Sequence, residues 1–353
     1  MKIINKKKKF LKLGKIKITD SSPVSIIAEI GINHSGSLKK AKELVDIAKV
    51  NGAKIIKVQI HIPDEEMSLE ARKIKPGNSN LSIYEVVRKN SLNLKDELLL
   101  KKYIEKKKLF YLATPFSFAA VDWLIKNNIK AFKIGSGECG NFPLLKYIAK
   151  FKKPMVVSTG MHSIKQISDT VKLLKKKKCK FALLHCTNLY PTDIKLSRLN
   201  RILLLKKLFK DNIIGYSDHS VGTQIPKLAV ALGAKIVEKH FVKSKKQMGP
   251  DVSCSMDPSD LSEMVSEFNN ISLAIKFNSK NDIIKEETVT RKFALHSVVA
   301  KSNILKGVKL SHKNLTVKRP GTGDFHSNKI NYLIGKTAKK NIKSNTQIKK
   351  HHV

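Results

Sequence analysis

The chain has 353 residues, of which 41% are apolar, and this length suits one large domain with a small one, or two domains of medium size. Its formal net charge of +41 would suit a nucleic-acid-binding protein, but only six of the 69 basic residues are arginine, the lysines are spread along the whole sequence, and no zinc-finger or RNP pattern accompanies them. No stretch approaches the roughly 20 apolar residues of a membrane span, and the basic N-terminus lacks the apolar core of a signal peptide, so we expect a cytoplasmic protein that binds neither nucleic acid nor membrane.

From residue 24 to about residue 277, eight short apolar runs rich in β-branched residues alternate with longer amphipathic segments. The runs are Val24–Ile30, Lys54–Gln59, Leu109–Ala113, Ala131–Ile134, Met155–Ser158, Phe181–His185, Ile213–Tyr216 and Lys235–His240. Helical periodicity covers Leu38–Val50, Lys95–Lys107, Phe118–Lys126, Ile164–Lys176 and Gly222–Leu232. Eight βαβ units in about 250 residues predict an α/β protein with a (β/α)8 TIM barrel, and a doubly wound open sheet is the alternative.

Two segments depart from this alternation. Residues His61–Asn93 form a long insertion after the second run, with turn residues at Pro76–Asn78, and could cover a site at the end of that strand. Polar residues begin at Asn278, after which the apolar runs are short. We therefore predict a catalytic barrel with an N-terminal extension over residues 1–277, a linker over 278–290 and a small domain of short strands over 291–353.

Polar, hydroxyl and charged side chains lie at the C-terminal end of every predicted strand, which is where barrel enzymes build their active sites. They include Glu29, Lys57, Gln59, Lys133, Ser136, Glu138, Ser158, Asn188, Tyr190, Ser217, His219 and His240. The last two end adjacent strands, so their imidazoles could meet at one divalent ion. The alternative, that each is an ordinary core or surface histidine, stays open at this point.

Lys57 and Lys133 lie inside apolar runs, and a buried ammonium group requires an anionic partner. With the surrounding hydroxyl groups, these lysines could hold a small ligand that carries a phosphate and a carboxylate. Alternatively, each could pair with a core carboxylate such as Glu29 or Glu138. A third hypothesis makes Lys133 a Schiff-base nucleophile, as in barrel aldolases.

Nine phrases occur in one order along the chain: AEIGINHSG from Ala28, TPFS from Thr114, KIGSGE from Lys133, STGM from Ser158, HCTNLYP from His185, SDH from Ser217, EKHF from Glu238, GPDVSCSMDP from Gly249 and KRPGTGD from Lys318. Together they resemble the NeuB-type sialic-acid synthases over roughly residues 20 to 350. The segment from Glu286 is similar to the antifreeze-like (SAF) module of that family. Departures are Ser35 for a usual Asn, Val58 for a frequent His and Tyr216 for a usual Leu, and none of them removes a proposed ligand.

The resemblance implies an activity. Phosphoenolpyruvate would condense with N-acetylmannosamine and water to give N-acetylneuraminate and phosphate, by addition to the aldehyde and cleavage of a C–O bond. The alternative within the family is a legionaminate or pseudaminate synthase that uses a diacetamido hexose. A divalent metal, Mn²⁺ first and Mg²⁺ or Co²⁺ as alternatives, and a domain-swapped homodimer are also implied.

The resemblance further assigns a role to each site residue. Metal binding falls to His219 and His240. Phosphoenolpyruvate binding falls to Lys57, Lys133, Ser136, Ser158, Asn188 and Ser217, and proton handling to Glu29 and Glu138, with the two lysines and two glutamates as the catalytic set. Sugar binding falls to Gln59, Tyr190, Asp251 and, reaching across the dimer from the tail module, Arg319.

Overall fold

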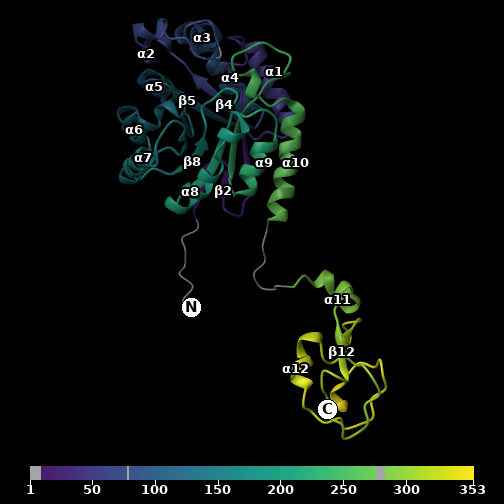
Figure 1. Ribbon diagram of the computed structural model, residues 1–353. Coiled ribbons are helices and arrows are strands. Elements are labelled where there is room, and N and C mark those ends of the chain that lie inside the picture. Colours follow the sequence, from purple (N-terminus) through teal and green to yellow (C-terminus); the bar gives the residue numbers. More distant parts are fainter. Residues whose placement is uncertain (1–8, 78, 276–282) are drawn as a thin grey trace. The chain divides into compact units, whose positions relative to one another are not determined.

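The computed structural model describes residues 9–77, 79–275 and 283–353. The chain forms two compact units, Met1–Lys276 and Phe277–Val353, each with its own hydrophobic core (Figure 1). The start of the predicted linker, residues 278–282, lies outside the described residues, as do residues 1–8 of the predicted extension and Asn78 of the predicted insertion. Within the described ranges no helix is both long enough and apolar enough to cross a membrane.

Eight parallel strands close into a barrel in sequence order. They are β3 (Ser25–Glu29), β4 (Ile55–Ile60), β5 (Phe110–Pro115), β6 (Phe132–Ile134), β7 (Met155–Ser158), β8 (Phe181–Cys186), β9 (Ile213–Asp218) and β10 (Ile236–His240). The last strand pairs with the first, in a register that places Ile236 opposite Ser25 and His240 opposite Glu29. This closure confirms the predicted (β/α)8 barrel and excludes the open sheet.

Helices surround the barrel (Figure 1). They are α1 (Leu38–Val50), α4 (Leu94–Lys106), α5 (Phe118–Lys126), α6 (Phe142–Ala149), α7 (Ile164–Lys176), α8 (Asn200–Leu208), α9 (Gln224–Ala231) and α10 (Pro258–Ala274). The five predicted helices are confirmed to within two residues at each end. Side-chain caps begin several of them, for example the Ser163 hydroxyl, which accepts a hydrogen bond from the Gln166 backbone N–H at the start of α7. Helix α10 was not predicted, although Asp257 and Pro258 are a recognisable N-cap and first helical residue.

The insertion after β4 is folded into short helices. They are α2 (Pro63–Glu66), the 3₁₀ turn η1 (Leu69–Arg72) and α3 (Ile83–Asn90). The last begins with a reciprocal capping box between Ser82 and Glu85. A segment predicted only as a long loop therefore has ordered local structure, and it lies at the end of the barrel where the strands point.

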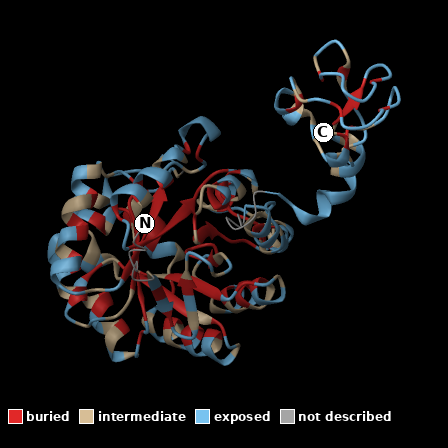
Figure 2. Ribbon diagram, turned by 90° about the horizontal axis from the view of Figure 1, so that it is seen from below, coloured by how far each residue is buried: buried red, intermediate tan, exposed pale blue. Residues whose placement is uncertain are grey.

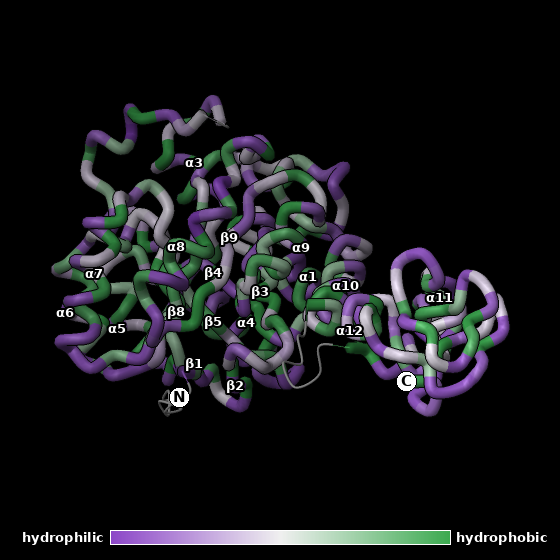
Figure 3. Tube along the Cα trace, turned by 60° about the horizontal axis from the view of Figure 1, so that its bottom comes forward, coloured by the Kyte–Doolittle hydropathy of each residue, from purple (hydrophilic) through white to green (hydrophobic). Residues whose placement is uncertain are grey.

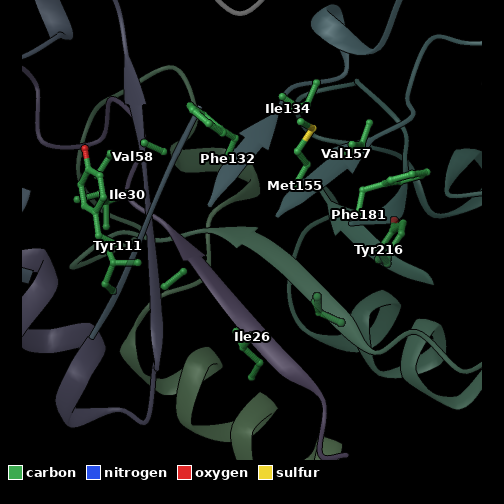
Figure 4. Packing of buried hydrophobic residues seen from close by; sticks show 14 of the residues in the cluster. Ile26, Ile30, Val58, Tyr111, Phe132, Ile134, Met155, Val157, Phe181 and Tyr216 are labelled. Atoms are coloured by element: carbon green, nitrogen blue, oxygen red, sulfur yellow. The ribbon is translucent and has the colours of Figure 1, made fainter. Parts of the chain in front are cut away.

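Strand residues alternate between the two faces of the barrel wall, because successive side chains of a strand point to opposite sides. In β4, Val58 and Ile60 pack outward against helices, whereas Ile55 belongs to the core inside the barrel. Lys57 and Gln59 share the inward face of Ile55 by the same alternation. Figure 4 shows part of the outer packing, and Figure 2 shows the buried strands enclosed by helices whose outer faces are exposed. Alternation thus separates a continuous apolar shell from an interior that becomes polar towards the strand ends.

A hairpin closes the N-terminal end of the barrel. Its strands β1 (Phe10–Leu13) and β2 (Ile16–Thr19) are antiparallel, and Leu11 and Leu13 are at most 1% exposed among the inward-facing apolar residues of the barrel strands. Figure 3 shows this hairpin at the opposite end of the barrel from α3. The sequence analysis treated this segment only as a basic extension. The alternation of lysine with apolar residues on either side of Gly14, which has a φ of +58°, was the available signal.

The second unit is built from short antiparallel pairings around a small apolar core. The backbone N–H of Ile304 donates to the carbonyl of Ile342 at 2.9 Å, and the reverse bond is 2.8 Å long. Its elements are α11 (Thr288–Ala294), β11 (Ser297–Ala300), β12 (Leu315–Lys318) and α12 (Ile330–Leu333). Short 3₁₀ turns complete the two units: η2 (Gly137–Gly140), η3 (Ile194–Leu196), η4 (Val252–Cys254), η5 (Lys285–Glu287), η6 (Ser327–Lys329) and η7 (Lys350–His352).

Shortening a buried side chain of the hairpin should destabilise the barrel. Leu13 is fully buried, so Leu13→Ala should lower the free energy of unfolding by about 2–5 kcal/mol through lost burial and a residual cavity. Urea unfolding followed by circular dichroism measures this change. The matched control is Leu273→Ala, because Leu273 is 69% exposed on α10. Equal losses in the two variants would show that the hairpin does not contribute to the core.

Candidate active site

The inward-facing residues at the strand ends form one polar group. The parallel register places Glu29 beside Lys57, His240 beside Glu29, and Ser217 beside Glu238. All five of these residues are buried. The barrel thus brings together side chains that are separated by up to about 200 positions in the sequence.

Two lysines and two carboxylates make direct contacts in this group, and we call Glu29, Lys57, Lys133 and Glu238 the Lys–Glu cluster. The ammonium of Lys57 contacts the Glu29 carboxylate. Oε1 of Glu238 lies 3.3 Å from Lys57 Nζ and 3.4 Å from Lys133 Nζ, and it accepts a 3.2 Å hydrogen bond from the Ser217 hydroxyl. Every side chain of the cluster is at most 6% exposed. One carboxylate oxygen therefore joins both lysines.

The electrostatics of the cluster are those of paired charges in a buried site. Burial alone would raise the pKa of Glu238, but the ammonium groups of Lys133 and Lys57 lower it to about 2. Burial lowers the pKa of Lys57 to about 8, although the Glu238 carboxylate opposes this shift. Glu238 is therefore ionised throughout the physiological range, whereas Lys57 is close to its titration point.

Lys133 makes three polar contacts. Its Nζ donates to the Ser158 hydroxyl at 2.8 Å and to the carbonyl of Ile134 at 3.1 Å, besides lying near Glu238. A Schiff-base nucleophile needs an amine that is free to attack a carbonyl, whereas this nitrogen donates to two oxygens and lies close to a third. The contacts therefore favour an anion-holding role for Lys133.

Glu138 lies apart from the Lys–Glu cluster. It is half-buried on η2, and its Oε2 accepts a 2.6 Å hydrogen bond from the Asn141 amide. Burial raises the pKa of Glu138, and the nearby Glu66 carboxylate raises it further. The hydrogen bond from Asn141 acts in the opposite direction. The sequence analysis named Glu29 and Glu138 as possible lysine partners. Glu29 does contact Lys57, but the second carboxylate that pairs with the lysines is Glu238 and not Glu138. The available signal was strand alternation, since Glu238 and His240 are two residues apart on β10 and therefore share its inward face.

The segments that carry Ser136, Gly160 and Asn188 lie close together, and their approach depends on the lack of a side chain at Gly160. The backbone N–H of Gly160 donates to the Ser136 hydroxyl at 3.1 Å. A Cβ at position 160 would lie 1.8 Å from Asn188 Oδ1 and 2.8 Å from Ser136 Oγ. Glycine is therefore required here for Ser136 and Asn188 to lie close to the ends of β7 and its neighbours.

The rings of two histidines and a tyrosine lie close together and tilted to one another at the strand ends. The ring centroids of His219 and His240 are 5.5 Å apart, and Tyr190 lies 4.2 Å from His219. Burial lowers the pKa of His219 to about 4 and that of His240 to about 3, so both imidazoles are neutral near pH 7. Nδ1 of His219 is 2.9 Å from the carbonyl of Thr187, which leaves its Nε2 lone pair free.

These residues fit a divalent ion in their chemistry. Neutral imidazole is the ligand form of histidine, and Nδ1 of His240 is buried without a hydrogen-bond partner among the described residues. Asp251 Oδ2 lies 3.6 Å from that nitrogen. The described part of the chain nevertheless contains no group of three or more His, Cys, Asp or Glu side chains arranged to hold a metal. An ion at the histidine pair would therefore need water or substrate oxygens to complete its coordination.

A cavity of about 620 Å³ opens above the strand ends. The insertion supplies part of its wall, through Pro76, Gly77 and three residues of α3. Four of the predicted site residues besides Asn188 line it: Gln59, Tyr190, His240 and Asp251. Arg319 lies in the second unit, where it is exposed after β12, so its role stays a prediction.

Other polar residues of the same motifs face away from the cavity. His185 points outward, where its Nε2 contacts the carbonyl of Ser197 at 2.8 Å. Lys239 and Asp218 pair with each other in the wall, on the opposite strand face from Glu238 and Ser217. The same alternation that assembles the site thus removes these groups from it.

Comparison with known proteins places these features in a family. Residues 44–280 match the NeuB family and residues 296–353 the SAF domain. N,N'-diacetyllegionaminic acid synthase from Campylobacter jejuni is 38% identical, over 92% of this chain and 98% of the relative. Human N-acetylneuraminate-9-phosphate synthase is 35% identical, over 89% and 88% of the two chains. The crystal structure of N-acetylneuraminic acid synthetase from Leptospira borgpetersenii, in complex with citrate, has a TM-score of 0.73 at 34% identity and covers 80% of this chain and 95% of that chain.

Removal of the Glu238 carboxylate, which both lysines share, should lower the stability of the protein. Glu238→Gln leaves Lys133 buried without its anion and should lower the free energy of unfolding by about 3–5 kcal/mol at pH 7. The matched control is Glu263→Gln, which breaks a partly exposed ion pair with Lys227 and should change stability little. Urea unfolding of both variants measures the difference. A loss for Glu238→Gln no larger than the control would contradict the assigned role of the cluster.

Proposed function

The chain belongs to the NeuB family, which includes sialic-acid synthases, and from this premise we propose that it condenses phosphoenolpyruvate with N-acetylmannosamine and water to give N-acetylneuraminate and phosphate. The observation that carries the proposal is the placement of two anion-holding lysines and two neutral histidines at the same strand ends, beside one cavity. The alternative is a legionaminate or pseudaminate synthase that performs the same chemistry on a diacetamido hexose.

Phosphoenolpyruvate would bind at the lysine side of the site. Lys57 and Lys133 supply positive charge for its phosphate and carboxylate, and hydroxyl and amide groups supply further hydrogen bonds. Those groups are Ser136, Ser158, Asn188 and Ser217. A buried set of fixed donors holds the enol carbon in one orientation, which reduces the entropy cost of a reaction between two substrates.

The sugar would lie in the cavity beside the histidine pair. Its open-chain aldehyde faces the lysine-bound enol, while Gln59, Tyr190 and Asp251 contact its hydroxyl groups. A divalent ion held by His219 and His240, for which we propose Mn²⁺ with Mg²⁺ or Co²⁺ as alternatives, supplies Lewis acidity to the aldehyde oxygen when bound. The protein's part is to keep both imidazoles neutral by burial, and thus able to act as ligands.

The reaction balances without a covalent enzyme intermediate. The enol carbon of phosphoenolpyruvate attacks the aldehyde carbon and forms the new C–C bond. Water then adds to the cationic carbon that bears the phosphate, and phosphate leaves as that C–O bond breaks. We assign proton handling to Glu29 and Glu138. Burial raises the pKa of Glu138, which favours its exchanging a proton with water.

The cavity wall supports an unphosphorylated sugar. Its described lining residues include no lysine or arginine, and Asp193 and Asp251 would repel a phosphate. Three carbons added at C1 of a hexose turn its C6 into C9, so a 9-phosphate product requires a sugar 6-phosphate. The human relative is named for such a product, whereas we propose that this chain uses free N-acetylmannosamine. The phrases Pro76–Asn78 and Gly323–Phe325 resemble those of N-acetylneuraminate synthases, which supports N-acetylmannosamine over a diacetamido hexose. A cytoplasmic location and a domain-swapped homodimer, in which Arg319 reaches the partner's sugar, complete the proposal.

Phosphate release tests the proposal. The purified full chain is given phosphoenolpyruvate and Mn²⁺ with N-acetylmannosamine, its 6-phosphate or 2,4-diacetamido-6-deoxy sugars, each with and without EDTA. Release that requires N-acetylmannosamine and stops with EDTA is expected. Release only with a diacetamido sugar would keep the chemistry and change the substrate. Release only with the 6-phosphate would contradict the argument from the cavity wall, and no release from folded protein would refute the catalytic assignment.

The pH dependence should report Lys57. Because its pKa in the free protein is about 8, the cation is present below that pH and is lost above it, so kcat/KM for phosphoenolpyruvate should fall as pH rises through about 8. Initial rates between pH 6 and 10 measure this limb. Lys57→Arg keeps a positive charge over the whole range and should remove the limb, at a lower maximal rate. An unchanged kcat/KM for the wild type up to pH 10 would contradict the assignment.

A further inference from the structure

A histidine that the sequence analysis did not single out lies between two acceptors at the cavity wall. His61 follows β4 directly, at the start of the insertion, and lines the cavity. Its Nδ1 is 2.8 Å from Glu66 Oε1, and its Nε2 is 3.0 Å from Gln59 Oε1. The ring is stacked on Phe116, at 4.4 Å between centroids and an interplanar angle of 7°. These three contacts, with Glu66, Gln59 and Phe116, therefore fix the position and the plane of the His61 ring.

The protonation of His61 decides which end of the Gln59 amide faces the sugar. A neutral imidazole has one N–H donor, so it can donate to Glu66 and must then accept from the amide NH₂ of Gln59. A doubly protonated imidazole donates to both neighbours, so Gln59 contributes its oxygen and turns its NH₂ towards the cavity. The two states thus offer the sugar an acceptor or a donor at the same position.

The surroundings of Glu66 favour the charged ring. The side chains of His61 and Glu66 are only 7% and 4% exposed, and a carboxylate this buried needs a cation. Oε2 of Glu66 has no hydrogen-bond partner among the described residues. The nearby His34 is kept neutral by burial, which lowers its pKa to about 4, so it cannot replace His61 as the cation. Asp251, which also lines the cavity, adds a further negative neighbour.

We propose that Glu66 holds His61 doubly protonated, and that His61 in turn holds Gln59 with its NH₂ group directed into the cavity as a donor to an oxygen of the sugar. The inference rests on the proposed function for the identity of the ligand. Glu66 and His61 are then positioning residues, which act through Gln59. Because Glu66 ends α2, folding of the insertion is coupled to the donor pattern of the sugar site.

Ring-nitrogen NMR tests the charge state without any substrate. The full chain, labelled with ¹⁵N-histidine, is compared at pH 7 with Glu66→Gln, and His61→Gln assigns the signal among the eleven histidines. Both ring nitrogens of His61 should show the shift of a protonated nitrogen in the wild type, and one should lose it in Glu66→Gln. A neutral His61 in the wild type would overturn the proposal, whatever the enzyme assay shows.

Steady-state kinetics test the action through Gln59, with N-acetylmannosamine or the diacetamido sugar that supports turnover. Glu66→Gln should raise KM for the sugar about tenfold, the scale of one lost hydrogen bond, and leave KM for phosphoenolpyruvate unchanged. The matched control, Glu65→Gln, changes an exposed neighbour on the same helix and should alter neither constant.

A double-mutant cycle separates positioning from a general structural effect. In a Gln59→Ala background, Glu66→Gln should have no further effect on KM for the sugar, because the group it positions is gone. Independent, multiplying effects would overturn the proposal, as would equal rises in both KM values. If no sugar is turned over at all, the proposed function fails, while the NMR result still decides whether the charged His61–Glu66 pair exists.

Discussion

The site depends on the burial of four charges in one barrel. Two ammonium groups and two carboxylates, all nearly inaccessible to water, are held together because each would be costly alone. Glu238 is the centre of this arrangement, since one of its oxygens faces both lysines. Its lowered pKa keeps it ionised, whereas burial brings the pKa of Lys57 down to about 8. In the proposed function, stability and phosphoenolpyruvate binding would therefore draw on the same charges, and the ligand would meet lysines that are already oriented.

The packing of the barrel wall allows these charges to be buried together without disrupting the apolar core. Strand alternation sends apolar side chains outward to the helices and leaves the inner face free for polar groups only near the strand ends. At the other end the β1–β2 hairpin fills the interior with Leu11 and Leu13, so the inside of the barrel is apolar below and polar above. A packed floor under a polar site excludes water from the lower barrel and keeps the strand ends in register.

Small details of backbone and loop then set the shape of the site. The absence of a side chain at Gly160 allows Ser136 and Asn188 to approach, and His61, in contact with Glu66 of the folded insertion, joins the wall of the cavity. The lysine side, where two ammonium groups are paired with two carboxylates, and the histidine side, with its two neutral imidazoles, thus differ in chemistry. This division suits a reaction that joins an anionic donor to a sugar aldehyde, as membership of the NeuB family leads us to propose.

The sequence alone determined the number of barrel strands, the barrel class and the residues at the strand ends, because the periodicity of apolar residues is a local property of the chain. It also carried enough family phrases to predict the chemistry. Only the tertiary structure decided that Glu238, and not Glu138, shares the lysines, that a basic N-terminal segment closes the barrel, and that His61 is paired with Glu66 and Gln59. Each of these depends on contacts across the closed barrel or within an irregular loop, where the distance between side chains follows from strand register and loop path and not from any repeating pattern in the chain.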